Sequence, residues 1–183
     1  MKKIALLIAF SISQIICFGQ FSLTKDGLVN TKNPEVPYIV LEFEGKSQEE
    51  LYNLVHIYLN KIYLSPKDVL SVLENKSISI NGISKDVIQV KKRAFYDIRY
   101  TISIEFKDGR IRVNTPIILD IYKYVSLQKF TLELINRAFT PGIFFKNGDV
   151  NYEMPKKSVE DYINSYIQNI SEAISSNSKE DNW

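Results

Sequence analysis

The strongest constraint on the fold lies in the stretch YTISIEFKDGRIRVN, from Tyr100 to Asn114. Apolar and polar residues alternate on both sides of Asp108-Gly109, which is typical of two strands joined by a two-residue turn. With that turn, Glu105 faces Arg112 and the neighbouring apolar residues face one another. A slip by one residue would turn every apolar side chain to the wrong face, so the register is well specified. We therefore predict an antiparallel hairpin closed by a type I′ turn.

Only one face of this hairpin is apolar, which indicates an antiparallel sheet with one face against a core. Two amphipathic segments are available to cover that face. Residues 46–64 begin with a capping box formed by Ser47 and Glu50, and an apolar stripe at helical spacing follows. Residues 155–175 carry a second stripe. The prediction is a two-layer α+β sandwich, with an antiparallel sheet of about five strands and two helices packed on one face.

The remaining segments give weaker signals. Residues 37–45 alternate as a strand, and residues 68–82 predict two short strands. We expect residues 83–97 to link these strands to the hairpin. Residues 126–139 fit a helix, although they also alternate, and residues 140–152 carry the Pro-Gly and Asn-Gly signals of a loop or short hairpin.

The start of the chain has the order of a secretory signal peptide. Two lysines precede an apolar run from Ile4, and small residues precede Gln20. We expect cleavage after Gly19, with lipidation of Cys17 as the alternative. The expected organisation is a signal peptide at 1–19, an N-terminal extension at 20–37, one α+β domain at 38–175 and a flexible tail at 176–183. This predicts an exported protein that is periplasmic, envelope-associated or secreted.

Removal of the leader changes the charge balance. The whole chain has 23 basic and 21 acidic residues, and loss of Lys2 and Lys3 leaves 21 of each. This neutral balance argues against binding to nucleic acid. The single cysteine also leaves with the leader, so the mature chain has no disulfide and no thiolate metal site. No later apolar run is long enough to predict a transmembrane segment.

Four blocks of the sequence follow one another as FSLTKDGLVN, EFEGKSQEELYNLV, KDVLSVLENKSISINGI and YTISIEFKDGRIRV. They resemble successive blocks of a family of exported bacterial domains, domain-of-unknown-function family 4468. The clearest similarities are the K-S-x-E-E-L-Y helix start and the K-D-G-R turn, and the resemblance covers roughly residues 38–122. It implies a TATA-binding-protein-like fold, a curved antiparallel sheet with helices on one face. The family has no assigned activity, and a shared fold does not imply DNA binding.

Few residues offer catalytic chemistry. His56 is the sole histidine, and it lies off the apolar stripe of its predicted helix, so we expect a solvent-facing side chain. Glu42 and Glu44 share one strand face and are interpreted as solvated, because alternating acids on a strand more often form a solvated face than a catalytic pair. There is no glycine-rich phosphate loop and no G-x-S-x-G motif. We predict no cofactor and no metal, with an enzyme that uses paired carboxylates on an envelope substrate as the alternative.

The polar face of the hairpin is the first candidate partner site. It carries Arg99, Glu105, Arg110 and Arg112, with Arg93 as a further neighbour. Arginines can hold carboxylates or phosphates through paired hydrogen bonds. The alternative interpretation is a solvated sheet face with local ion pairs.

An apolar loop is the second candidate. It surrounds Pro-Gly with Phe139, Ile143, Phe144 and Phe145, which either fold back onto the core or meet a partner. From these features we expect an exported, non-catalytic interaction or structural module of the bacterial envelope. Its partner would be an unidentified protein or envelope component.

N-terminal sequencing of the mature protein tests the leader. We expect the first residue to be Gln20 or a residue within two positions of it, because the small residues of the cleavage site end at Gly19. A retained leader, or a lipid on Cys17, would contradict this prediction.

Overall fold

The computed structural model describes residues 20–124, 126, 128–133 and 141–176. The predicted leader, Phe139 and residues 177–183 of the tail lie outside these ranges. The elements follow in the order β1 (Phe21–Thr24), β2 (Gly27–Asn30), β3 (Tyr38–Glu42), α1 (Gln48–Ile62), α2 (Pro66–Val69), β4 (Leu70–Leu73), β5 (Ser77–Lys91), β6 (Ala94–Lys107), β7 (Arg110–Asn114), β8 (Ile117–Lys123), β9 (Gln128–Glu133), β10 (Gly142–Phe144) and α3 (Glu153–Ser176).

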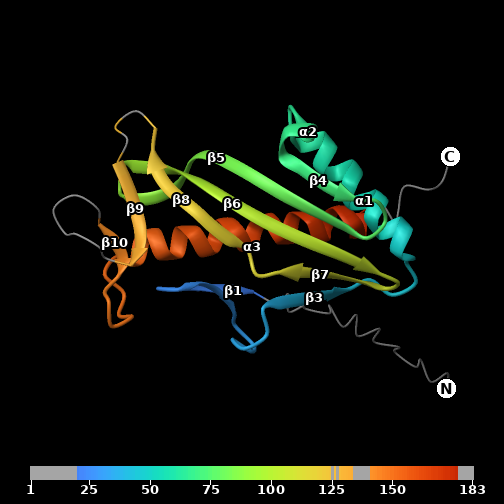
Figure 1. The fold of residues 1–183 in the computed structure, drawn as a ribbon, viewed down its shortest axis with the longest axis horizontal. Helices are drawn as coiled ribbons and strands as arrows, with labels where there is room; N and C mark the ends of the chain where they lie inside the picture. Colours follow the sequence, from blue (N-terminus) through green and yellow to red (C-terminus); the bar gives the residue numbers. More distant parts are fainter. Residues whose placement is uncertain (1–19, 125, 127, 134–140, 177–183) are drawn as a thin grey trace, which may run out of the picture.

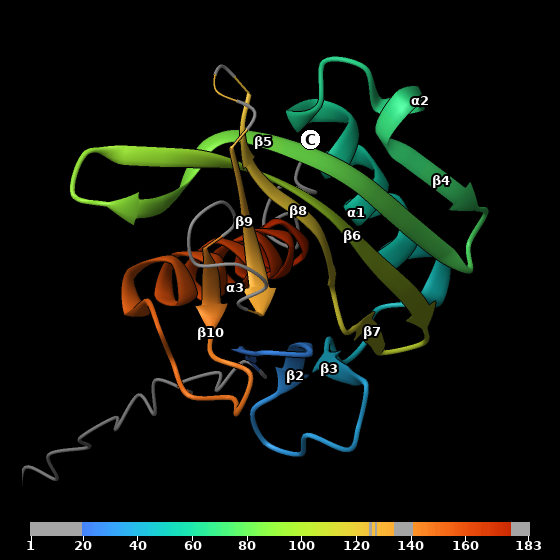
Figure 2. The same cartoon turned by 60° about the vertical axis from the view of Figure 1, so that its left-hand side comes forward.

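The fold is a mixed α+β sandwich of one large sheet and two long helices, with a separate two-stranded sheet, β1–β2 (Figure 1). Eight strands form the sheet, in the order β10-β9-β8-β6-β5-β4, and β7 pairs with both β6 and β3. The β9–β10 pair is parallel and the other pairs are antiparallel. The long helices α1 and α3 lie on one side of β5 and β6, while the other side of the sheet stays open (Figure 2). The α+β class and the single helical layer are thus confirmed, with more strands than the predicted five.

The predicted hairpin register is confirmed, with Glu105 opposite Arg112 and Lys107 opposite Arg110. The type I′ turn is wrong, because Gly109 has a φ of +73° and Asp108 does not have a positive φ. Contacts with the start of α1 accompany this turn. The Asp108 carboxylate accepts the Gln48 N–H at 2.8 Å, and the Gly109 N–H donates to the Lys46 carbonyl at 2.8 Å. The turn therefore docks the hairpin onto the helix in addition to reversing the chain.

Two other sequence expectations are corrected. Residues 83–97 are not a link, since they complete β5 and begin β6, strands of 15 and 14 residues. Irregular pairing between Ser84 and Ile88 interrupts the alternation that would have marked one long strand. Residues 128–133 of the expected 126–139 helix form β9, whose Phe130 pairs with Ile121 and packs edge-on to Tyr96.

The helices bury their apolar stripes against the sheet. In α3 the buried residues include Val159, Ile163 and Ile167, as the pattern predicts. In α1 the buried arc is rotated from the expected one. Tyr52 is buried, whereas Ile62 is 42% exposed at the helix end. The ring of His56 stacks on Tyr52 with centroids 5.5 Å apart, so this histidine has a packing contact on the helix surface.

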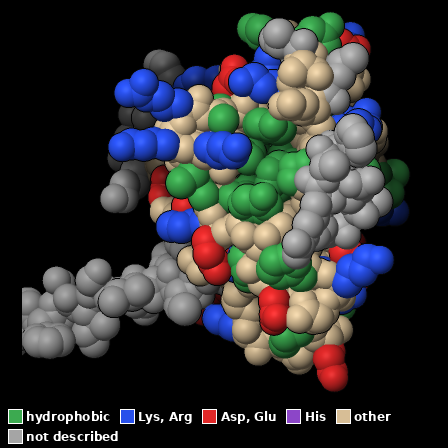
Figure 3. Space-filling model, turned by 90° about the vertical axis from the view of Figure 1, so that its left-hand side faces the viewer, with side chains coloured by type: hydrophobic (Ala, Val, Ile, Leu, Met, Phe, Trp, Pro, Cys, Tyr) green, Lys and Arg blue, Asp and Glu red, His purple; other side chains and the backbone are tan. Residues whose placement is uncertain are grey.

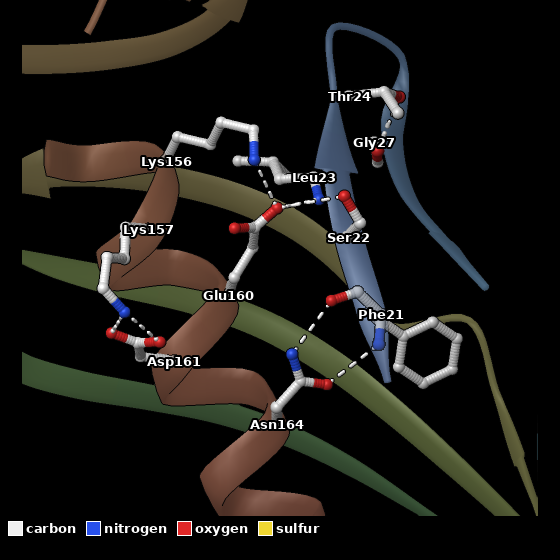
Figure 4. Close-up of polar contacts among 10 residues, drawn as sticks. All are labelled: Phe21, Ser22, Leu23, Thr24, Gly27, Lys156, Lys157, Glu160, Asp161 and Asn164. Atoms are coloured by element: carbon white, nitrogen blue, oxygen red, sulfur yellow. Dashed lines mark hydrogen bonds and ion pairs between the residues drawn. The ribbon is translucent and has the colours of Figure 1, made fainter. Parts of the chain in front are cut away.

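A separate hairpin, β1–β2, closes one side of α3 (Figure 4). The Asn164 side chain accepts the Phe21 N–H and donates to the Phe21 carbonyl, both at 2.9 Å, as a neighbouring strand would. The Glu160 carboxylate accepts the Leu23 N–H at 2.7 Å. Phe21 and Leu23 are buried in the same core as the sheet. Residues 21–30 are therefore packed against the domain that we placed at 38–175.

Tyrosines connect the sheet to both helices. The ring of Tyr100, on β6, occupies the space beside Gly82 on β5, where an added Cβ would lie 2.4 Å from the ring. Hydroxyl contacts then run from Ser84 to Tyr162 at 2.5 Å, to Tyr100 at 3.1 Å, to Tyr63 at 3.4 Å and on to Tyr166 at 2.7 Å. We call these five residues the tyrosine chain. Burial is the main cause that raises the pKa of each of its tyrosines, so all four stay protonated near neutral pH.

The Gly82→Ala variant tests the packing of Tyr100. The added methyl group has no room beside the ring, so the free energy of unfolding should fall by about 1–3 kcal/mol, as for an overpacked core. Chemical denaturation measures this loss. Asn81→Ala on the open face is the control and should cost about 1 kcal/mol or less. If both variants unfold like the wild type, the packing described for Tyr100 is wrong.

Candidate functional site

The centre of the open face of the sheet carries polar pairs beside the exposed apolar side chains of Ile83 and Ile117. Across β5 and β6, the Ser79 and Ser103 hydroxyls lie 2.9 Å apart, and Thr101 donates to the Asn81 side chain at 2.9 Å. In each pair, one side chain is the hydrogen-bond partner of the other. The two pairs form an uncharged strip on the side of the sheet away from the helices.

A pocket of about 240 Å³ lies at one end of this face, where β3, β6 and β7 meet. We call it the sheet-face pocket. It is lined by Tyr38, Val40, Glu105, Lys107, Arg110, Ile111 and Arg112. Three of the four residues that sequence analysis assigned to the partner face, namely Glu105, Arg110 and Arg112, are brought together here.

Arg112 is held in place on two sides. Its guanidinium donates to the Glu105 carboxylate at 2.5 Å and lies 5.0 Å from the centre of the Tyr38 ring. The Asn114 side chain donates to the other Glu105 oxygen at 2.9 Å. The hydrogen bond from Arg112, and then that from Asn114, lower the pKa of Glu105 below its ordinary range, while Glu105 raises the pKa of Arg112. This pair stays charged at neutral pH.

Lys107 and Arg110 are the remaining cations of the pocket. Among the residues that the structure describes, neither forms an ion pair within 4.0 Å. Lys107 still contributes to the lowered pKa of Glu105 through its charge. Glu42 lies opposite Arg110 in the β3–β7 register, but the two side chains do not form an ion pair. The pocket therefore has two cations with capacity for an external anion.

Arg99 and Arg93 lie away from this pocket. Arg99 pairs with Asp120 on β8, and Asp120 also accepts from Lys129 at 3.2 Å. Arg93 lies in the turn between β5 and β6, at the opposite end of these strands from Lys107. The predicted arginine face is thus divided between two ends of the sheet.

The described part of the apolar loop that was predicted as a partner site lies in the core. Ile143 and Phe144 belong to β10 and are 0% and 2% exposed, so these two side chains do not offer a surface to a partner. The Phe145 N–H donates to the Asp149 carbonyl at 2.8 Å in the short turn that follows. Phe139 lies outside the described residues.

Sequence reasoning missed Tyr38, Val40 and Lys107 as pocket residues. The polar alternation of the hairpin includes Lys107, but nothing local indicates that β3 pairs with β7. That pairing brings Tyr38 and Val40 beside Arg112 from more than 70 positions away in the chain.

Within the described ranges no group of three or more His, Cys, Asp or Glu side chains could hold a metal ion, and no helix there is long and apolar enough to cross a membrane.

The Glu105→Gln variant tests the Arg112–Glu105 ion pair, because it removes the negative charge of Glu105 and keeps the size of the side chain. The pKa of Glu105 is lowered from 4.5, so its ion pair stabilises the fold above that pH, and this contribution is lost as the pH falls through the lowered pKa. For an exposed pair the wild type should be more stable than the variant by about 1 kcal/mol or less at neutral pH. Urea denaturation near neutral pH and again well below pH 4.5 measures this difference. Glu44→Gln is the control. A difference for Glu105→Gln that persists in acid would contradict the assignment.

Comparisons with known proteins address the fold. The profile of a family described as a domain of unknown function (DUF4468) with TBP-like fold matches residues 38–118. A crystal structure of a TBP-like protein from Parabacteroides distasonis superposes with a TM-score of 0.57 at 14% identity, covering 75% of this chain and 90% of that one. A DUF4468 family protein from Bacteroides ovatus superposes with a TM-score of 0.53 at 15% identity, covering 75% of this chain and 84% of that one. No curated protein matches the chain. Residues 38–118 therefore resemble the DUF4468 domain of unknown function, and the chain has a TBP-like fold.

Proposed function

We propose that this chain is an exported, non-catalytic interaction module of the bacterial envelope. In this proposal, the sheet-face pocket holds a carboxylate of a protein partner. The observation that supports it is the placement of Lys107 and Arg110, without ion pairs of their own, beside the Arg112–Glu105 pair.

The arrangement suits a carboxylate because each part of the pocket has a distinct role. The free cations attract the anion, and an arginine offers two parallel N–H donors that match its two oxygens. Tyr38 and Val40 add apolar contact area beside the charges. A pocket of about 240 Å³ accepts one side chain or a chain terminus, so the partner's remaining contacts would fall on the surrounding sheet.

The charge pattern of the open face disfavours a polyanion. Arg99 and Arg112 are each neutralised by a carboxylate of the same face, and Glu42 adds a further negative charge near Arg110. Nucleic acid is bound through many phosphate contacts along a continuous basic surface. A single partner carboxylate needs only the two free cations.

An enzyme with two carboxylates is the alternative. A general acid needs a raised carboxyl pKa near the operating pH. Hydrogen bonds to Glu105 shift its pKa in the opposite direction. This favours the interaction module, and export rests on the signal-peptide pattern of residues 1–19.

Binding of a labelled peptide that carries one glutamate and an amidated C-terminus tests the pocket. Fluorescence anisotropy should show saturable binding by the wild type, and the Lys107→Ala/Arg110→Ala double variant should bind about tenfold more weakly, a loss of about 1.4 kcal/mol. Arg93→Ala is the control, since it removes a cation at the distant turn. Thermal unfolding of each variant checks that the fold is unchanged.

Two outcomes would contradict the proposal. The first is equal affinity of the wild type and the double variant. The second concerns partners captured from envelope extracts: both proteins capture them equally, and an excess of the free one-glutamate peptide does not reduce the capture.

A further inference from the structure

A second and larger concavity lies on the helical side of the molecule. It has a volume of about 860 Å³ and runs along α3 from Glu153 to Asn169, with Val87 and Gln89 of β5 on its other wall. We call it the α3 groove. Its volume falls within the range of small-molecule sites, about 300–1,000 Å³. Met154, at 44% exposed, lines it at the start of α3. Figure 3 shows the end of the molecule that lies on the left of Figure 1, where hydrophobic side chains gather beside Lys and Arg.

The groove exists because β4 is short. It pairs with β5 only from Ser77 to Ile80, so beyond Ile80 the outer edge of β5 has no partner strand among the described residues. Ser158 of α3 bridges the gap. Its hydroxyl accepts the Gln89 N–H at 2.9 Å and donates to the Val87 carbonyl at 3.3 Å.

These two hydrogen bonds limit the ways in which a ligand can bind in the groove. A peptide that adds to a sheet edge needs unpaired N–H and C=O groups along that edge. Ser158 already occupies those of Gln89 and Val87. Recognition in the groove must therefore come from side chains rather than from strand addition.

The side chains offer aromatic surface together with uncharged hydrogen-bonding groups. Tyr162 and Tyr166 line the groove from successive turns of α3. Tyr166 ends the tyrosine chain, where its hydroxyl contacts that of Tyr63 at 2.7 Å, and the side chain as a whole is half-buried. Ser165 and Asn169 are exposed on the same side of the helix, and neither has a side-chain hydrogen bond among the described residues.

The charges of the groove nearly cancel. Lys157 binds both oxygens of Asp161, at 2.9 and 2.8 Å, which leaves Glu153 as the unpaired charge among the lining residues. There is no cation free to attract a phosphate or sulfate. A ligand that matches this wall is neutral and rich in hydroxyl groups, and it has apolar ring faces that can lie against tyrosine.

We propose that the α3 groove is a binding site for a neutral oligosaccharide. The sugar faces would pack on Tyr162 and Tyr166, and Asn169 and Ser165 would exchange hydrogen bonds with its hydroxyl groups. This site lies on the helical side of the sheet, opposite the sheet-face pocket, so it is independent of the function proposed above.

Titration of the purified chain with chitotriose, maltotriose and cellotriose, followed by amide chemical shifts in NMR spectra, tests the site. At least one trisaccharide should give saturable shifts centred on α3 from Glu153 to Asn169. Asn169→Ala should weaken that binding about tenfold. Ser165→Trp should abolish it, because the exposed position allows a bulky ring to fill the groove without disturbing the core.

Gln168→Ala is the matched control, since Gln168 is exposed on α3 but does not line the groove. It should bind as the wild type does, as should Lys107→Ala in the sheet-face pocket. The proposal is overturned if none of the three sugars gives saturable shifts at millimolar concentration. It is also overturned if Gln168→Ala loses as much affinity as Asn169→Ala, or if a trilysine peptide binds the groove more tightly than every sugar.

Discussion

The ring of Tyr100 against Gly82 is the contact on which the two-layer arrangement depends. A glycine in the middle of a long strand weakens it, unless a neighbouring side chain uses the space that the missing Cβ leaves. Here the cross-strand tyrosine fills that space and still reaches the helical layer with its hydroxyl. Through Tyr63 and Tyr162 it contacts the end of α1 and the middle of α3. One side chain thus joins β5, β6 and both long helices.

The two sides of the sheet therefore offer different surfaces to a ligand or partner. The apolar side is covered by α1 and α3, which leaves the other side open (Figure 1). At one end of that open side, β3 adds to β7 and completes a pocket with two unpaired cations. The α3 groove, by contrast, lies where β4 no longer covers β5.

Local patterns predicted the parts of the fold whose partners are close in sequence. The alternation from Tyr100 to Asn114 is sufficient for the register of the β6–β7 hairpin, and the Ser47 cap marks the start of α1. The turn conformation did not follow, because Asp108 is engaged by Gln48, which lies 60 positions earlier. The bulge after Ser84 concealed the length of β5, and the aromatic packing of Phe130 decided between helix and strand for β9. The pocket was predicted only in part, because Tyr38 and Val40 reach it through a long-range strand pairing.

A double-mutant cycle between Tyr100 and Tyr162 tests the central claim most directly, that Tyr100 couples the sheet to the helical layer. Each Tyr→Phe change removes one hydroxyl and keeps the ring. The 3.1 Å contact predicts that the two losses of unfolding free energy add up to about 1 kcal/mol more than the loss in the double variant. Losses that are additive to within about 0.3 kcal/mol would show that the two hydroxyls are not coupled and would contradict the account.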